Sequence, residues 1–214
     1  MPLHFALVLL LLGFGMGYSA RAGKLTLPAV WTGGALGVGI YLGAGFLGLG
    51  LLALFFGLGT AASAWRVADK RRLGLAEANR GRRTAGQVLA NAGVAGLLGL
   101  VAWQLPTHAP LCRLMLAGSF AAATADTLAS ELGNIYGRRY VNILTFRPDE
   151  RGLDGVISLE GTLLGLAGTA LVAGCYCLIH GWQPAFWVLL VAGTVGNLSD
   201  SVLGATVERP APSR

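Results

Sequence analysis

The basic residues of this chain are confined almost entirely to alternate gaps between long apolar segments. All but one of the 16 Lys and Arg residues lie in the first, third and fifth gaps and in the C-terminal tail, and the exception is Arg113. Membrane-spanning segments orient with their Lys- and Arg-rich loops in the cytoplasm. The alternation therefore predicts seven spans, with the N-terminus outside and the C-terminus in the cytoplasm.

The apolar segments have the lengths that membrane spans need. Only 12% of the residues are charged and 54% are hydrophobic, whereas soluble domains carry about twice that share of charge. We therefore expect an all-α integral membrane protein, a polytopic bundle of about seven transmembrane helices that forms a single domain over residues 1–214. The expected spans are 3–20, 27–42, 46–65, 85–104, 111–132, 156–180 and 185–205.

The stretch 25–65 contains no charged residue, although basic residues flank it on both sides. As one straight helix it would be roughly 60 Å long, about twice the thickness of the hydrocarbon core. We therefore expect a hairpin that turns near Gly43-Ala44-Gly45. The first apolar segment is followed, not preceded, by positive charge, which is the reverse of a signal peptide. We expect it to be a retained span of a multi-pass protein in the cell's inner (cytoplasmic) membrane.

Two compositional features have ordinary explanations in a membrane protein. The formal net charge of +6 follows from a basic cytoplasmic rim, so it does not indicate a nucleic-acid partner. Small residues mark the places where helices approach closely in lipid. The small-residue spacings that predict helix contacts are those of Gly33, Gly34, Gly37 and Gly39, and of Gly161, Gly165 and Gly168.

Six of the ten acidic residues fall at the predicted cytoplasmic ends of three consecutive spans. They are Asp126 and Glu131 in the fifth span, Asp154 and Glu160 around the start of the sixth, and Asp200 and Glu208 at the end of the seventh. Neighbouring carboxylates raise one another's pKa unless cations neutralise them. Mg²⁺ prefers a few carboxylates together with phosphate oxygens and water. The convergence predicts a Mg²⁺–carboxylate site on the cytoplasmic face.

Other interpretations of the acidic residues remain open. Each carboxylate could instead cap a helix or pair with an arginine in a non-catalytic scaffold or lipid-binding protein. A cation- or proton-coupled transporter would use the cluster as a relay, and it predicts polar residues that continue to the outer side. The sequence has no P-loop and no protein-kinase signature set. Its three histidines lie near the predicted outer side, which argues against a Ser–His–Asp hydrolase.

Four blocks of polar and small residues lie in the second half of the chain. They read GQVLANAG at 86–93, ATADTLASELG at 123–133, GLDGVISLEGT at 152–162 and DSVLGAT at 200–206. In order and spacing they resemble the integral-membrane family that includes the plant plastid phytyl-phosphate kinase of vitamin E biosynthesis. Leu153 and Val156 stand where the family pattern has Thr and Gly. Family members usually continue past the position of Arg214 into a further apolar segment, which we expect to bear on substrate choice.

The resemblance implies phosphoryl transfer from a nucleoside triphosphate, with CTP favoured, to an isoprenyl monophosphate of the phytyl or geranylgeranyl type. Another CTP-dependent lipid transferase remains an alternative, and the sequence leaves open whether the protein is a homodimer. Phosphoryl transfer depends mainly on positioning and charge neutralisation. The residues expected to act are Asp126, Glu131 and Asp200 in Mg²⁺ binding, Asp126, Asp154, Glu160 and Asp200 in catalysis, and Arg82, Arg83, Asn91, Arg138, Arg139, Ser158 and Asn197 in substrate and phosphate binding.

Overall fold

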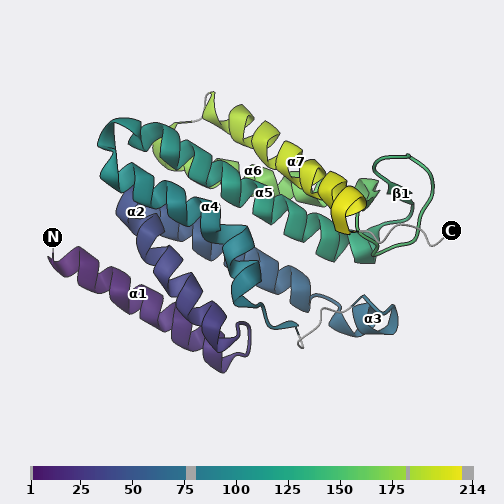
Figure 1. Cartoon of the computed structure of the whole chain (residues 1–214), viewed down its shortest axis with the longest axis horizontal. Coiled ribbons are helices and arrows are strands. Elements are labelled where there is room, and N and C mark those ends of the chain that lie inside the picture. The colour runs from purple at the N-terminus through teal and green to yellow at the C-terminus, as the bar shows by residue number, and fades with distance from the viewer. Residues whose placement is uncertain (1, 76–80, 182–183, 209–214) are drawn as a thin grey trace.

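The computed structural model describes residues 2–75, 81–181 and 184–208, and helices make up most of this part of the chain (Figure 1). The helices are α1 (Pro2–Arg21), α2 (Leu27–Ala64), α3 (Val67–Arg72), α4 (Ala85–Gln104), the 3-10 turn η2 (Pro106–His108), α5 (Ala109–Tyr136), α6 (Leu159–His180), α7 (Ala185–Leu203) and the π-helical turn η3 (Gly204–Glu208). The expected helical class is confirmed.

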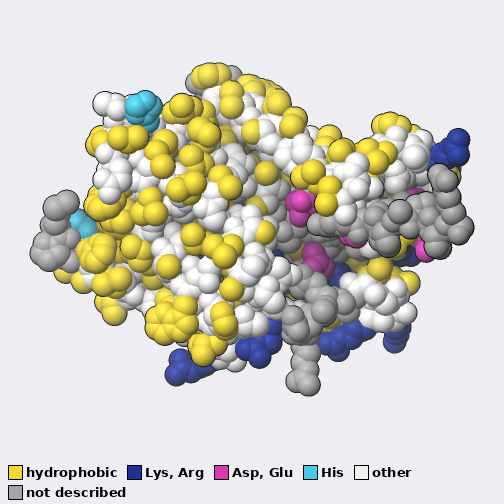
Figure 2. Space-filling view, in the orientation of Figure 1, with side chains coloured by type: hydrophobic (Ala, Val, Ile, Leu, Met, Phe, Trp, Pro, Cys, Tyr) yellow, Lys and Arg dark blue, Asp and Glu magenta, His cyan; other side chains and the backbone are white. Residues whose placement is uncertain are grey.

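Five of the described helices, α1, α2, α4, α6 and α7, are long and apolar enough to cross a membrane. Helix α5 is of comparable length but more polar, because it carries Arg113, Asp126 and Glu131. On the face shown in Figure 2, most of the visible Lys and Arg side chains lie along the lower edge, near the α1–α2 connection and α3, and others lie at the right-hand end. The number of crossings and the outside position of the N-terminus stay predictions.

Helix α2 is broken at Gly45, whose φ of 61° lies in the left-handed region that glycine adopts without strain. Its two halves return alongside each other, since Phe56 of the second half packs against the cluster that Leu25, Ala29 and Val30 form around the start of the first. The expected hairpin near Gly43-Ala44-Gly45 is thereby confirmed. Arg113, the one basic residue outside the predicted cytoplasmic gaps, donates from Nε to the Gly43 carbonyl at 2.8 Å and so satisfies a polar backbone group at the break.

Small residues bring several helix backbones into direct contact. A Cβ added to Gly39 of α2 would lie 3.2 Å from the Gly96 carbonyl oxygen of α4. One added to Gly165 of α6 would lie 2.9 Å from the Ala125 carbonyl oxygen of α5. The helix contacts expected from these glycine spacings are confirmed, and larger side chains there would push the helices apart.

Helix α5 lies at the centre of the bundle and packs against α2, α4, α6 and α7. Its Leu116 and Phe120 are fully buried, and the Phe120 ring lies 6.0 Å from that of Phe55 on α2. Because α5 is enclosed in this way, the polar residues at its C-terminal end are held among the ends of the neighbouring helices.

A short antiparallel ribbon connects α5 to α6, formed by β1 (Tyr140–Asn142) and β2 (Val156–Ser158), with Tyr140 opposite Ser158. The predicted span 156–180 was therefore wrong at its start. Residues 156–158 are extended and paired, and α6 begins only at Leu159, where the Ser158 side chain caps it. Strand pairing between distant segments leaves little trace in the local hydrophobic pattern, so the sequence did not predict the ribbon.

Candidate functional site

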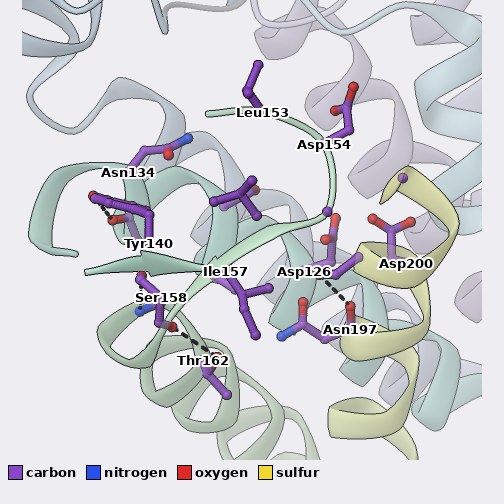
Figure 3. Close-up of a pocket in the computed structure, with 18 of the residues that line it drawn as sticks. Asp126, Asn134, Tyr140, Leu153, Asp154, Ile157, Ser158, Thr162, Asn197 and Asp200 are labelled. Atoms are coloured by element: carbon purple, nitrogen blue, oxygen red, sulfur yellow. Dashed lines mark hydrogen bonds between the residues drawn. The ribbon is translucent and has the colours of Figure 1, made fainter. Parts of the chain in front are cut away.

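Three aspartates from different elements line one cavity of about 170 Å³ at the end of the bundle (Figure 3). Asp126 comes from α5, Asp154 from the loop before β2, and Asp200 from α7. Ser158 and Asn197 line the same cavity, which we call the acidic pocket. Of the six acidic residues expected to converge, Asp126, Asp154 and Asp200 thus line one cavity.

The charged side chains that line the acidic pocket are all negative. None of its lining residues is Lys, Arg or His, and the described residues show no ion pair to Asp154 or Asp200. Within the same described ranges, no three His, Cys, Asp or Glu side chains come close enough together to form a metal cage. The pocket thus offers separate carboxylates that would attract a cation, whose remaining ligands a substrate or water would have to supply.

The loop that carries Asp154 packs against η3, the turn that continues α7. Gly155 has a φ of 73°, and a Cβ on it would lie 2.2 Å from the Ala205 Cβ. Glycine is needed here for both its backbone conformation and its size. In Figure 3 this loop runs past Asp126, with Asp200 beside it on α7, and the Asp154 carboxylate points away from both. The close contact therefore places Asp154 on the same pocket as Asp200.

The N-terminus of α6 forms another wall of the pocket. Ser158 caps the helix, and its Oγ accepts the Gly161 N–H at 3.1 Å. Asn197 is only 5% exposed, and its Nδ2 lies so close to α6 that a Cβ on Gly165 would be 2.9 Å from it. Helix N-termini carry partial positive charge and favour anions. The pocket therefore combines a wall suited to an anion with carboxylates suited to a cation.

A second cavity of about 380 Å³ lies between α4, α5 and α7, and we call it the apolar groove. Asn91, Asp126 and Asp200 line it, and the latter two are shared with the acidic pocket. Val94 and Met115 line it as well. On the face shown in Figure 2, acidic side chains are visible in a recess bordered by apolar ones. The two cavities therefore meet at Asp126 and Asp200.

Glu131 has a different environment from the pocket aspartates. Its Oε2 accepts a hydrogen bond from Lys70 Nζ of α3, and its Oε1 accepts one from Ser63 Oγ at 2.8 Å. The Lys70 side chain is only 3% exposed, so this is a buried ion pair. The structure does not bring Glu131 together with Asp126 and Asp200, and its role as a metal ligand stays a prediction.

Glu160 and the basic candidates also lie outside the pocket lining. Glu160 accepts the Arg138 backbone N–H at 3.3 Å, and Arg138 and Arg139 are exposed. Arg83 is 9% exposed and places its guanidinium 5.4 Å from the Phe55 ring centroid. Arg82 donates to the Leu25 carbonyl at 3.2 Å. Their phosphate-binding roles stay predictions, and the side chain of Glu208 lies outside the described residues.

One polar wall of the pocket, formed by Tyr140 and Asn134, was not among the residues predicted from the sequence. Tyr140 donates its hydroxyl to the Gly133 carbonyl at 3.0 Å, and Arg151 donates to the Asn134 carbonyl at 3.0 Å while lying over the Tyr140 ring. Burial raises the pKa of Tyr140, with Arg151 opposing and Glu160 reinforcing the shift. The β-branched and aromatic residues of 140–143 and 156–158 were the available signal, because such runs favour strands.

The sequence and its relatives define the class of protein. The chain belongs to the family described as integral membrane protein DUF92, whose profile matches residues 8–213. It is thus an integral, multi-pass membrane protein, and the family resemblance seen in the four sequence blocks is confirmed.

Three curated relatives show how far this similarity extends. The chloroplastic protein VTE6 of Arabidopsis thaliana is 33% identical over 172 residues, which cover 78% of this chain and 51% of the relative. An uncharacterized membrane protein of Synechocystis, sll0875, is 34% identical over 185 residues, covering 83% and 69% of the two chains. Protein PGR of Arabidopsis thaliana is 31% identical over 199 residues, covering 82% and 69%. The chain spans about half the length of VTE6. No solved structure matches it.

Proposed function

We propose that this protein is a membrane-embedded phosphotransferase that converts an isoprenyl monophosphate into the diphosphate. The donor is a nucleoside triphosphate, with CTP favoured, and the acceptor is of the phytyl or geranylgeranyl type. The reaction depends on Mg²⁺. The isoprenyl substrate and the kinase activity rest on the family resemblance and on the relationship to the chloroplastic protein VTE6.

The observation that carries the proposal is the meeting of two unlike cavities at Asp126 and Asp200. The acidic pocket is small, lined by carboxylates and polar groups, and the apolar groove extends from it between three helices. A lipid phosphate has the same two parts, an apolar chain and an anionic head. Carboxylates repel such a head unless a cation lies between them, which is why a metal-dependent phosphate chemistry suits the pocket.

Asp126 and Asp200 are the residues that we assign to Mg²⁺. Two carboxylates with a substrate phosphate are a usual Mg²⁺ ligand set, and both side chains border a pocket whose described lining includes no basic group. When bound there, the ion would neutralise charge on the phosphate oxygens. Asp154, on the loop across the pocket, would help to position the donor.

The proposed reaction does not require a strong general base. A terminal oxygen of the isoprenyl monophosphate attacks the γ-phosphorus of the triphosphate and forms a new P–O bond. The bond from the γ-phosphorus to the bridging oxygen breaks, and the nucleoside diphosphate leaves with that oxygen. The attacking oxygen belongs to a phosphate and is already anionic. The α6 N-terminus with Ser158, and the amide of Asn197, would orient phosphate oxygens in the pocket.

The test is a product assay on the purified protein in detergent or nanodiscs. The protein is incubated with Mg²⁺, with phytyl or geranylgeranyl monophosphate, and with each nucleoside triphosphate in turn, and mass spectrometry detects the isoprenyl diphosphate. We expect product with CTP, and its loss in Asp126→Asn and Asp200→Asn. Glu150→Gln is the matched control, because Glu150 is an exposed loop acid outside both cavities. No product with any donor, from well-folded protein, would reject the kinase and favour a transporter or a scaffold.

A further inference from the structure

The apolar groove is built as a channel with a polar end and an apolar end. On α5 its lining residues fall on one stripe that runs from Asp126 back to Met115. At a rise of 1.5 Å per residue, this stripe is about 16 Å long. On α4 the lining runs from Asn91, beside the acidic end, to Leu98. Because α4 and α5 run in opposite directions, Leu98 lies toward the Met115 end.

Small residues line the middle of the groove. Ala122 and Ala123 of α5 and Gly196 of α7 line it. A Cβ on Gly196 would lie 2.5 Å from the Ala122 Cβ, so α5 and α7 are in contact there and close the groove on one side. Val94 and Met115 are 57% and 51% exposed, although each is a wall residue of the cavity.

We infer that the apolar groove between α4, α5 and α7 binds the isoprenyl chain of the substrate and that its Met115 end limits the chain length accepted. The inference rests on the proposed function, which supplies the class of substrate. It adds the binding site of the chain and the residue that selects for length. The shared aspartates fix the head at one end of the groove, so the chain must extend along the α5 stripe toward Met115.

The expected effects follow from steric exclusion. Lipid is as apolar as the groove, so the chain gains from close packing and little from transfer out of water. A larger side chain at the far end therefore excludes long chains and leaves short ones unaffected. A single methylene of misfit in an apolar site changes kcat/KM by about tenfold or more.

The kinetic test uses two substrates of different length, geranyl and geranylgeranyl monophosphate, on full-length protein in nanodiscs. Met115→Trp should lower kcat/KM for the longer substrate by about tenfold and leave that for the shorter one unchanged. Val94→Phe, nearer the aspartates, should lower both. Leu171→Trp is the matched control, because Leu171 is 52% exposed on α6 and lines neither cavity. If Met115→Trp changes kcat/KM for the two substrates no differently from Leu171→Trp, the inference is wrong, although the kinase activity itself would remain.

A binding test separates this inference from the proposed reaction. Geranylgeranyl monophosphate with a diazirine at the end of its chain is photolysed on the wild-type protein, and labelled peptides are mapped by mass spectrometry. We expect labels on α4 and α5 around Leu98 and Met115 that unlabelled geranylgeranyl monophosphate displaces. This result would support the groove even if no diphosphate formed in any assay. Labels confined to the outward faces of α1 and α6, or insensitive to competitor, would overturn the inference.

Discussion

Asp126 and Glu131 lie on the same helix, only five positions apart, yet they have opposite environments. At about 100° per residue they point about 140° apart around α5. Glu131 faces α2 and α3, where Lys70 and Ser63 hold both of its oxygens. Asp126 faces α4 and α7 and lines both cavities.

This difference separates a structural acid from a candidate catalytic one. Glu131 connects the short helix α3 to the bundle, because its partner Lys70 is buried and also donates to the Ala62 carbonyl at 2.7 Å. Asp126 and Asp200 instead share a space that is open to a ligand. The sequence alone presents these acids as members of one cluster, and only the direction in which each side chain points divides them.

The largest effect is expected from removing the negative charge of either aspartate that the two cavities share, Asp126 of α5 or Asp200 of α7. Asp126→Asn and Asp200→Asn should each lower kcat by about 10²- to 10³-fold, as the loss of a group that stabilises developing charge does. Thermal unfolding should change little, since Asn has the size of Asp and can still form hydrogen bonds. Product formation under single-turnover conditions measures this. Activity within a factor of a few of the Glu150→Gln control would remove both aspartates from the site.

Substitution of Glu131, on the opposite side of α5, should lower the stability of the protein and leave its activity intact. Glu131→Gln leaves the buried Lys70 without its counter-ion, which should cost about 3 kcal/mol, while the activity of the folded protein stays close to wild type. Unfolding in mixed detergent–SDS micelles measures the loss. The double variant Lys70→Met, Glu131→Leu should recover most of it, because an apolar pair of similar volume often replaces a buried ion pair. A loss of activity in that double variant, with the fold intact, would assign Glu131 to the site.

A smaller loss of turnover and stability is expected from changing the contact between the Asp154 loop and η3, the turn that continues α7. Gly155→Ala introduces a Cβ at positive φ and against the Ala205 backbone, 2.6 Å from its Cα. The conformation alone costs about 1–2 kcal/mol, and the loop must shift, so turnover should fall together with stability. Gly174→Ala on α6 is the control, since nothing lies within 4 Å of a Cβ there. Equal behaviour of the two variants would show that the position of Asp154 does not matter.

The smallest effect concerns the wall formed by Tyr140. Tyr140→Phe removes the hydrogen bond to Gly133 and should cost about 1 kcal/mol. Burial raises the pKa of Tyr140 above its ordinary value of 10.0 in the folded protein. The unfolded chain therefore loses this proton first as the pH rises, so the contribution of Tyr140 to stability is constant below about pH 10 and decreases above it. Unfolding profiles should show a shallower alkaline decrease in Tyr140→Phe, and identical profiles would contradict the assignment.

The sequence predicted the features that follow from length and charge. An uncharged stretch of 25–65 required a hairpin, and Gly45 provides its break. The topology deduced from the basic gaps placed Asp126, Asp154 and Asp200 at one end, where the acidic pocket lies. These arguments succeed because they depend on one-dimensional quantities, the number of apolar residues and the positions of charges.

The features that were missed all depend on pairing between distant segments. The β1–β2 ribbon joins Tyr140 to Ser158, and the Lys70–Glu131 pair joins two helices. The composition of 140–143 and 156–158 favours strands but does not show that the two pair with each other. The basic gaps look alike whether their residues are solvated or buried, so the Lys70–Glu131 pair could not be predicted either. The direction in which each acid of α5 points depends on how that helix packs. Small residues such as Gly165 of α6 set how closely the neighbouring helices approach α5.

The most direct test of the proposed metal site at Asp126 and Asp200 is to locate the divalent cation. Mn²⁺, a spectroscopic substitute for Mg²⁺, is titrated by electron paramagnetic resonance into protein with geranylgeranyl monophosphate, using wild type, Asp126→Asn, Asp200→Asn and Glu131→Gln. Binding of the cation by Asp126 and Asp200 predicts bound Mn²⁺ in wild type and in Glu131→Gln, and its loss in both aspartate variants. Binding that survives both aspartate substitutions, or that disappears only in Glu131→Gln, would contradict it.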